Sequence, residues 1–155
     1  MTDPNQLAHW FPTTVDVDVR VGAAMSLDFP NGGPDEMKGE VTELEPPRLF
    51  AFLWGDELLR FELEPADGGR ACRLRLTHFL PRSNEAARTA AGWHVCFDRL
   101  DQLVTTGAAE APSSEPTEEW LELYERYIEA GMPSGAAVPG SWLWKHPLHR
   151  ERRQS

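Results

Sequence analysis

The chain has 155 residues, which is enough for one domain with a buried core, and its 41% hydrophobic content is typical of a globular protein rather than a disordered one. Asp and Glu number 25 against 15 Lys and Arg, and the resulting net charge of -10 disfavours nucleic acid and anionic lipid as partners. No apolar run reaches the roughly 20 residues that cross a membrane, and the first ten residues do not resemble a signal peptide. We therefore expect a cytoplasmic protein with no nucleic-acid partner and no membrane partner.

The first half of the chain predicts an antiparallel sheet. Its segments alternate apolar and polar residues, and the β-branched and aromatic side chains fall on one side, as in half-buried strands. Short turns rich in Gly, Pro, Asn and Asp separate the segments, so successive strands should pair antiparallel. The six predicted strands are residues 15–21, a segment carrying Met25, Leu27 and Phe29, then 38–44, 48–54, 58–64 and 70–79.

A helical pattern replaces the alternation from about residue 84 to residue 104. Apolar residues recur there at intervals of three and four, which predicts one stripe of a long amphipathic helix. Ser83 or Asn84 can cap its first turn. The stripe consists of Ala90, Trp93, Phe97, Leu100 and Val104.

The remainder of the chain predicts a linker, a second helix and a tail. Residues 108–116 are rich in Ala, Pro, Ser and Glu, which is typical of a linker. A second helix should follow at 117–130, capped by Thr117 and ended by Gly131. The tail carries Trp142 and Trp144, which are too apolar to stay in water unless they dock or associate.

The cysteines and histidines do not predict a metal or cofactor site. Cys72 and Cys96 lack metal-ligand spacing, and Cys72 alternates with leucines, so we expect two structural thiols with Cys72 facing the core. His146 and His149 are separated by a proline that breaks any helix there. We expect no cofactor and no metal.

Several motifs resemble one known family when they are taken together. They are similar to the START/SRPBCC superfamily, and most similar to its branch of homologues of the activator of heat-shock-protein-90 ATPase. The segment around Trp120 and Tyr127 also resembles a tail found on bacterial members. The matching motifs are Thr2-Asp3-Pro4, Leu7, Trp10-Phe11-Pro12, the run from Gly39 to Leu49, Phe52, Trp54-Gly55, the run from Leu74 to His78, and Gly92-Trp93.

The resemblance implies an α+β helix-grip fold, in which a curved antiparallel sheet wraps a long carboxy-terminal helix around a ligand cavity. We expect this domain at 1–106, a linker at 107–116, an accessory helix at 117–131 and a partly disordered tail at 132–155. Relatives begin with a further strand and short helix, so the 70–79 strand should be left as a sheet edge here. A homodimer or the tail, with Trp142 and Trp144, could cover that edge, and like charges at Arg73 and Arg75 favour the tail.

A ligand cavity between sheet and helix should be lined by the inward aromatic and aliphatic side chains. Core packing is the alternative for each of them taken singly. His78 is the polar member of this set, either a ligand-binding group or general base, or a histidine bonded to the backbone at the rim, which we favour. The predicted cavity residues are Phe52, Trp54, Phe61, Leu63, Leu74, Leu76, His78, Trp93 and Phe97.

Three functions are compatible with these residues. The leading hypothesis is a non-enzymatic protein that binds a small hydrophobic or amphipathic molecule, because the inner face is aromatic and no catalytic motif is present. The alternative is a co-chaperone-like or regulatory module that acts through its surface. An enzyme of the cyclase or hydrolase type is the third, with His78 as its candidate base.

Overall fold

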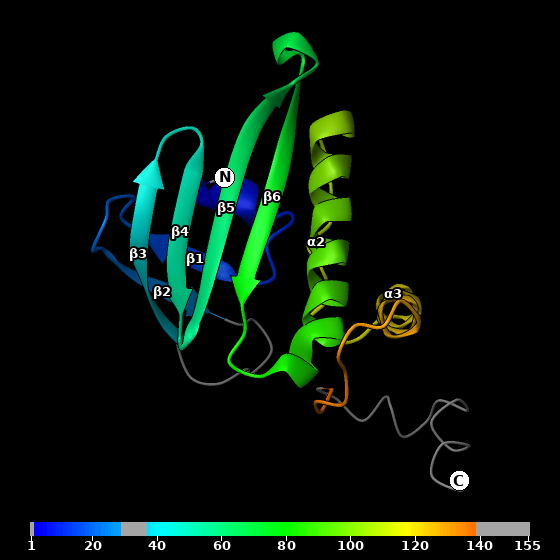
Figure 1. Ribbon diagram of the computed structural model, residues 1–155. Coiled ribbons are helices and arrows are strands. Elements are labelled where there is room, and N and C mark those ends of the chain that lie inside the picture. The colour runs from blue at the N-terminus through cyan, green and yellow to red at the C-terminus, as the bar shows by residue number, and fades with distance from the viewer. Residues whose placement is uncertain (1, 29–36, 139–155) are drawn as a thin grey trace, which may run out of the picture. The chain divides into compact units, whose positions relative to one another are not determined.

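A computed structural model describes residues 2–28 and 37–138, and these divide into two compact units, Met1–Pro81 and Arg82–Ser155 (Figure 1). The first unit contains the sheet and a short helix. The second contains a long helix and an accessory helix. Phe29, the turn predicted at 30–35, and the tail residues Trp142, Trp144, His146 and His149 lie outside the described residues.

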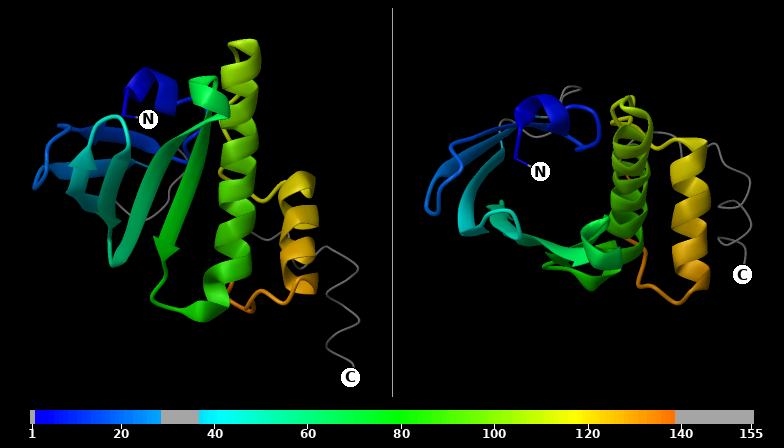
Figure 2. Two further views of the ribbon diagram at one scale, coloured as in Figure 1. Left: turned by 45° about the horizontal axis from the view of Figure 1, so that its top comes forward. Right: turned by 90° about the horizontal axis from the view of Figure 1, so that it is seen from above.

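The first unit is a six-stranded antiparallel sheet in which each strand pairs with its neighbours in the chain, as predicted. Figure 2 shows that the sheet is strongly curved. Gly or Pro residues lie in each of the described turns between strands, where the chain reverses, and the topology is a simple meander. The strands are β1 (Thr14–Val17), β2 (Ala24–Asp28), β3 (Met37–Glu45), β4 (Leu49–Trp54), β5 (Glu57–Ala66) and β6 (Ala71–Phe79), with the short helices α1 (Pro4–Leu7) and η1 (Asp67–Gly69).

Strand β1 is shorter than its alternating sequence predicted. It ends at Val17, whereas the alternation continues to Val21, and Val19 and Val21 are 39% and 57% exposed. Arg20 donates its backbone N–H to Asp18, and Gly22, with a φ of 80°, donates to the carbonyl of Val41. The chain therefore turns at 18–22 to reach β2, because turn hydrogen bonds replace the ladder.

One face of the sheet is apolar and forms the core of this unit. The register places Val41, Phe52 and Leu59 in one cross-strand row, and these side chains are at most 1% exposed. Phe50 and Phe61 form the next row. This face is called the apolar face below.

Among the described residues, the sheet runs from β1 at one edge to β6 at the other, so β6 is an edge strand, as predicted. The prediction that Cys72 faces the core is wrong, because Cys72 is exposed. It pairs with Pro65 close to the turn at η1, where the β5–β6 hairpin extends past the apolar rows. The alternation with leucines correctly predicted which face of the sheet Cys72 lies on, but at this end of the hairpin that face is exposed to solvent.

The second unit begins with a 3₁₀ turn, η2 (Ser83–Glu85), followed by α2 (Ala86–Thr106) and α3 (Glu118–Glu129). Neither Ser83 nor Asn84 caps α2, because both belong to η2 and the N-cap is Glu85. Thr117 caps α3 as predicted, since its Oγ1 accepts from the N–H of Trp120 at 3.2 Å. Residues 107–116 between the helices contain no regular structure.

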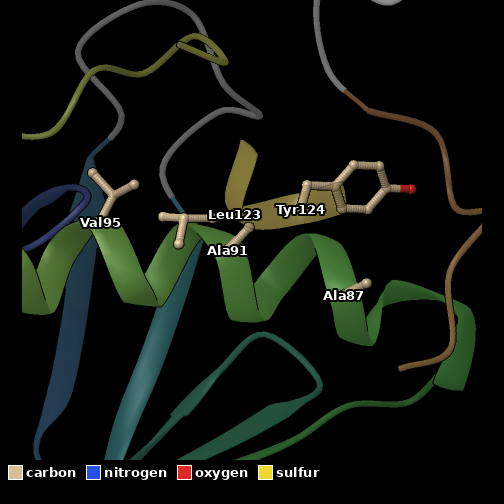
Figure 3. Packing of buried hydrophobic residues seen from close by; sticks show 5 residues of the cluster. All are labelled: Ala87, Ala91, Val95, Leu123 and Tyr124. Atoms are coloured by element: carbon tan, nitrogen blue, oxygen red, sulfur yellow. The ribbon is translucent and has the colours of Figure 1, made fainter. Parts of the chain in front are cut away.

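Helix α2 has a second apolar stripe, of small residues, that packs against α3 (Figure 3). Ala87, Ala91 and Val95 are spaced by four and contact Leu123 and Tyr124, all of them buried. The small side chains let the two helix backbones approach closely. Val104, predicted in the other stripe, lies in the last turn of α2 and is 78% exposed.

The segment that follows α3 returns to the start of α2. Ala87 donates its N–H to the carbonyl of Pro133 at 2.9 Å, and Ala136 donates to Asn84 at 3.2 Å. Arg88 binds the carbonyl of Ala137 through its guanidinium group. Residues 131–138 are therefore part of the packed unit.

Candidate functional site

A β-bulge in β3 builds one wall of the candidate site. Strict alternation would place Glu43 on the apolar face together with Val41. Instead, Val41 pairs with Phe52 and Glu43 pairs with Ala51, so Thr42 is an extra residue in the ladder. The bulge reverses the parity of the strand, which turns Glu43 outwards and Leu44 inwards opposite Phe50.

The turn after β3 supplies a second wall. Two prolines prevent the chain from continuing the ladder, and Arg48 donates its N–H to Glu45 at 2.7 Å to close the turn. The carbonyl of Arg48 accepts from the N–H of Leu63 at 2.8 Å, which holds the turn against β5. Pro46, Pro47 and Leu63 are thereby brought together.

These walls border an open apolar pocket of about 260 Å³ within the sheet unit. Thr2 provides a hydroxyl group, and the other side chains that line the pocket are aliphatic, proline or aromatic. No charged side chain is among the described residues that line it, so a charged ligand would lose its hydration without gaining a partner. The lining residues are Thr2, Val19, Leu44, Pro46, Pro47, Leu49, Phe50 and Leu63.

A second space beside this pocket is almost completely filled by aromatic rings. Its free volume is only about 10 Å³, and it shares Thr2 and Phe50 with the open pocket. Phe52 and Phe61 stack with their ring centroids 6.1 Å apart, and Phe11 lies 6.4 Å from Phe52. The centre of the apolar face is therefore packed core.

The structure places the predicted cavity residues of the sheet unit at four different positions. Leu63 lines the open pocket, whereas Phe52 and Phe61 line the filled space. Trp54 lies further along the same face and stacks on Phe11 at 5.9 Å. Leu74 and Leu76 are half-buried on β6, opposite Leu63 and Phe61 in the register.

Trp93 and Phe97 belong to α2 in the second unit. Their rings lie 6.0 Å apart, and Trp93 is 9% exposed. Both occupy the stripe that the spacing predicted. Their participation in a cavity with the sheet residues stays a prediction.

His78 pairs with a carboxylate at the end of the apolar face away from the open pocket. Its Nε2 lies 2.6 Å from Oε2 of Glu57, and the two side chains are 12% and 31% exposed. His78 thus has a carboxylate partner in the protein. A carboxylate can fix the orientation and tautomer of an imidazole, as it does in catalytic dyads.

Other reactive groups do not assemble into a site. The described residues contain no group of three His, Cys, Asp or Glu side chains that could hold a metal ion. Burial raises the pKa of the Cys96 thiol to about 12, so this cysteine is inert at neutral pH. No helix in residues 2–28 and 37–138 is long and apolar enough to cross a membrane.

Sequence reasoning missed several residues that build the site. The sequence predicted that Leu44, Pro46 and Pro47 belong to the end of a strand and the turn after it, but not that they line a pocket. The available signal for the bulge was the spacing of three residues between the apolar side chains of Val41 and Leu44. Glu57 gave no signal, because an acidic residue next to a turn is common. The rings of Trp10 and Phe11 pack on the apolar face of the sheet, and both are buried. The run of three bulky residues, Trp-Phe-Pro, was the available signal for a buried segment.

Comparisons with known proteins agree with this architecture. No curated protein matches the chain. CalU16 from Micromonospora echinospora is 21% identical in a solution structure, with a TM-score of 0.63 over 83% of this chain and 72% of that one. A conserved protein from Enterococcus faecalis, EF2215, is 20% identical, with a TM-score of 0.65 over the same shares. A protein from Bacillus halodurans, BH1534, is 23% identical, with a TM-score of 0.55 over 66% of this chain and 82% of that one.

These similarities show the fold, which is the α+β helix-grip class expected from the motifs. The profile described as activator of Hsp90 ATPase homolog 1-like protein matches residues 1–105, which include the whole sheet and nearly all of α2. The chain therefore belongs to the family of activator of Hsp90 ATPase homolog 1-like proteins.

Proposed function

We propose that the chain is a non-enzymatic binding protein for a small, uncharged apolar molecule, held in the pocket beside the turn at Pro46 and Pro47. The observation that carries this proposal is the apolar pocket of about 260 Å³. Family membership is compatible with a binding or regulatory module and identifies no ligand.

The size of the pocket limits the ligand. A cavity of about 150 Å³ in another protein binds benzene, so a volume of about 260 Å³ corresponds to roughly ten non-hydrogen atoms. That is the size of a two-ring aromatic molecule. At roughly 0.6 kcal/mol per atom, such a ligand would bind with a Kd of about 40 μM.

Calorimetric titration with 2-naphthol tests the proposal, with decanoate as a charged comparison. We expect 2-naphthol to bind in the range of about 10–100 μM and decanoate to bind more weakly, since its carboxylate finds no partner in the pocket. Leu63→Trp should fill the pocket and abolish binding. Leu53→Trp is the matched control, because Leu53 lies on the opposite face of the sheet and is 36% exposed. Equal binding by both variants would contradict the proposal.

A second candidate is a protein-interaction module, and one observation favours it. On the face opposite the pocket, Leu53, Leu58 and Phe79 form a cross-strand apolar row, and Phe79 is 55% exposed. Such rows are found at interaction surfaces. The test is ATP hydrolysis by a heat-shock-protein-90 chaperone with the chain or its Phe79→Ser variant. Stimulation that the variant loses would support this function, and no stimulation would argue against it.

A further inference from the structure

The amino-terminal flap, residues 2–11, covers both spaces of the candidate site. Thr2 lines the open pocket and the filled space, and Leu7, Trp10 and Phe11 line the filled space. Phe50 also borders both spaces. The two spaces are therefore neighbours under one segment of the chain.

The flap satisfies its own backbone hydrogen bonds. Pro4 starts α1, Asp3 caps it by accepting from Asn5 at 2.9 Å, and each backbone N–H from Gln6 to Phe11 donates to a carbonyl between Asp3 and Leu7. Lifting the flap would break none of the β ladders, and a four-residue helix that is no longer docked is too short to stay folded, so its amides would then exchange. The movement also exposes three buried side chains, Leu7, Trp10 and Phe11.

Trp10 is the principal side chain of the flap. It is 2% exposed, and its ring meets Phe11 edge-on at 5.5 Å and Phe61 edge-on at 6.5 Å. Edge-to-face contacts of this kind do not depend on which molecule supplies the ring. The indole of Trp10 therefore fills a place that suits a flat aromatic ligand.

We propose that the flap is a displaceable lid, and that a flat polycyclic apolar ligand too large for the open pocket binds by replacing Trp10. This inference rests on the proposed function and extends it to a larger ligand class. Displacement joins the filled space to the pocket of about 260 Å³. The combined site then enters the range of roughly 300–1,000 Å³ that is typical of ligand sites.

Hydrogen exchange in the unmodified chain, read by mass spectrometry, tests the lid directly. The probes are 2-naphthol, which fits the open pocket, and 1-hydroxypyrene, which does not. We expect 1-hydroxypyrene to increase exchange of the amides of residues 5–11 at least tenfold, and 2-naphthol to leave them unchanged. Binding of 1-hydroxypyrene without any change in these amides would overturn the lid.

The variant Trp10→Ala supplies an independent measurement. A site that is open only part of the time binds with an affinity reduced by its open fraction, so removing Trp10 should tighten binding of 1-hydroxypyrene at least tenfold. The Kd for 2-naphthol is measured in parallel. Trp120→Ala, in the second unit, is the control and should change neither value.

The outcomes separate the two proposals. If 2-naphthol binds and 1-hydroxypyrene does not bind even to Trp10→Ala, the lid is wrong and the proposed function stands. If neither probe binds the unmodified chain, the proposed function fails and the lid fails with it. The exchange experiment keeps the lid testable even where Trp10→Ala does not fold.

Discussion

Replacing Gly92 by Ala should stabilise the protein, because this glycine lies inside α2 without a conformational need for it. Ala is better than Gly in a helix interior by roughly 0.8–1.0 kcal/mol. A Cβ at this position would lie 3.8 Å from Nε1 of Trp120 on α3, which is an ordinary contact. Burying one more carbon adds at most about 0.8 kcal/mol.

The expected gain is therefore about 1–1.5 kcal/mol in the free energy of unfolding, or a Tm higher by about 2–6 °C. Urea denaturation and calorimetry measure both. Gly131→Ala is the control, since Gly131 has a φ of 89° with nothing within 4 Å of a built Cβ, and it should lose stability through backbone strain alone. A lower stability for Gly92→Ala would show that Trp120 lies closer to α2 than the structure places it.

Three further predictions concern single side chains. Trp93→Ala should lower the free energy of unfolding by about 3–5 kcal/mol, because the indole is 9% exposed, and a loss below about 1 kcal/mol in chemical denaturation would refute its burial. A thiol reagent should label exposed Cys72 in the native chain and Cys96 only after unfolding, so two fast reactions would contradict the buried position of Cys96. A hydrogen bond from Arg82 lowers the pKa of Glu85 from its ordinary value of 4.5, so Glu85 stabilises the fold above that pH and less as the pH falls through its folded pKa. Glu85→Gln should therefore show a shallower loss of stability in urea titrations stepped from pH 5 downwards, and an unchanged slope would refute this.

The strand order was predictable from the sequence because each strand carries its own signal. Alternation with period two identifies a half-buried strand locally, and short turns leave a meander as the simplest connection. The segment from Phe50 to Trp54 shows this, since every second residue is aromatic and lies on the apolar face. The end of β1 was misplaced because alternation persists into a turn, where hydrogen bonds decide the backbone path.

The candidate pocket was less predictable because it depends on a break in the pattern. The bulge at Thr42 is a property of the β3–β4 pair, and a single strand read alone does not reveal which residue is unpaired. Helix α2 gives a second example. Its aromatic stripe was predictable from the sequence, whereas its stripe of Ala87, Ala91 and Val95 was not. Alanines carry little hydrophobic signal, and their role becomes visible only when α3 is packed against them.

The return of the chain to the start of α2 makes the second unit a closed ring. Backbone hydrogen bonds from Ala136 to Asn84 and from Ala87 to Pro133 join the segment after α3 to the start of α2, and residues 107–116 connect the end of α2 to the start of α3. The entropy of closing such a ring grows only with the logarithm of its length, at about 0.6 kcal/mol per doubling. Insertions between the helices should thus be tolerated. A cut after Gly131 opens the ring and removes the carbonyl of Ala137 that Arg88 binds, so it should destabilise the unit.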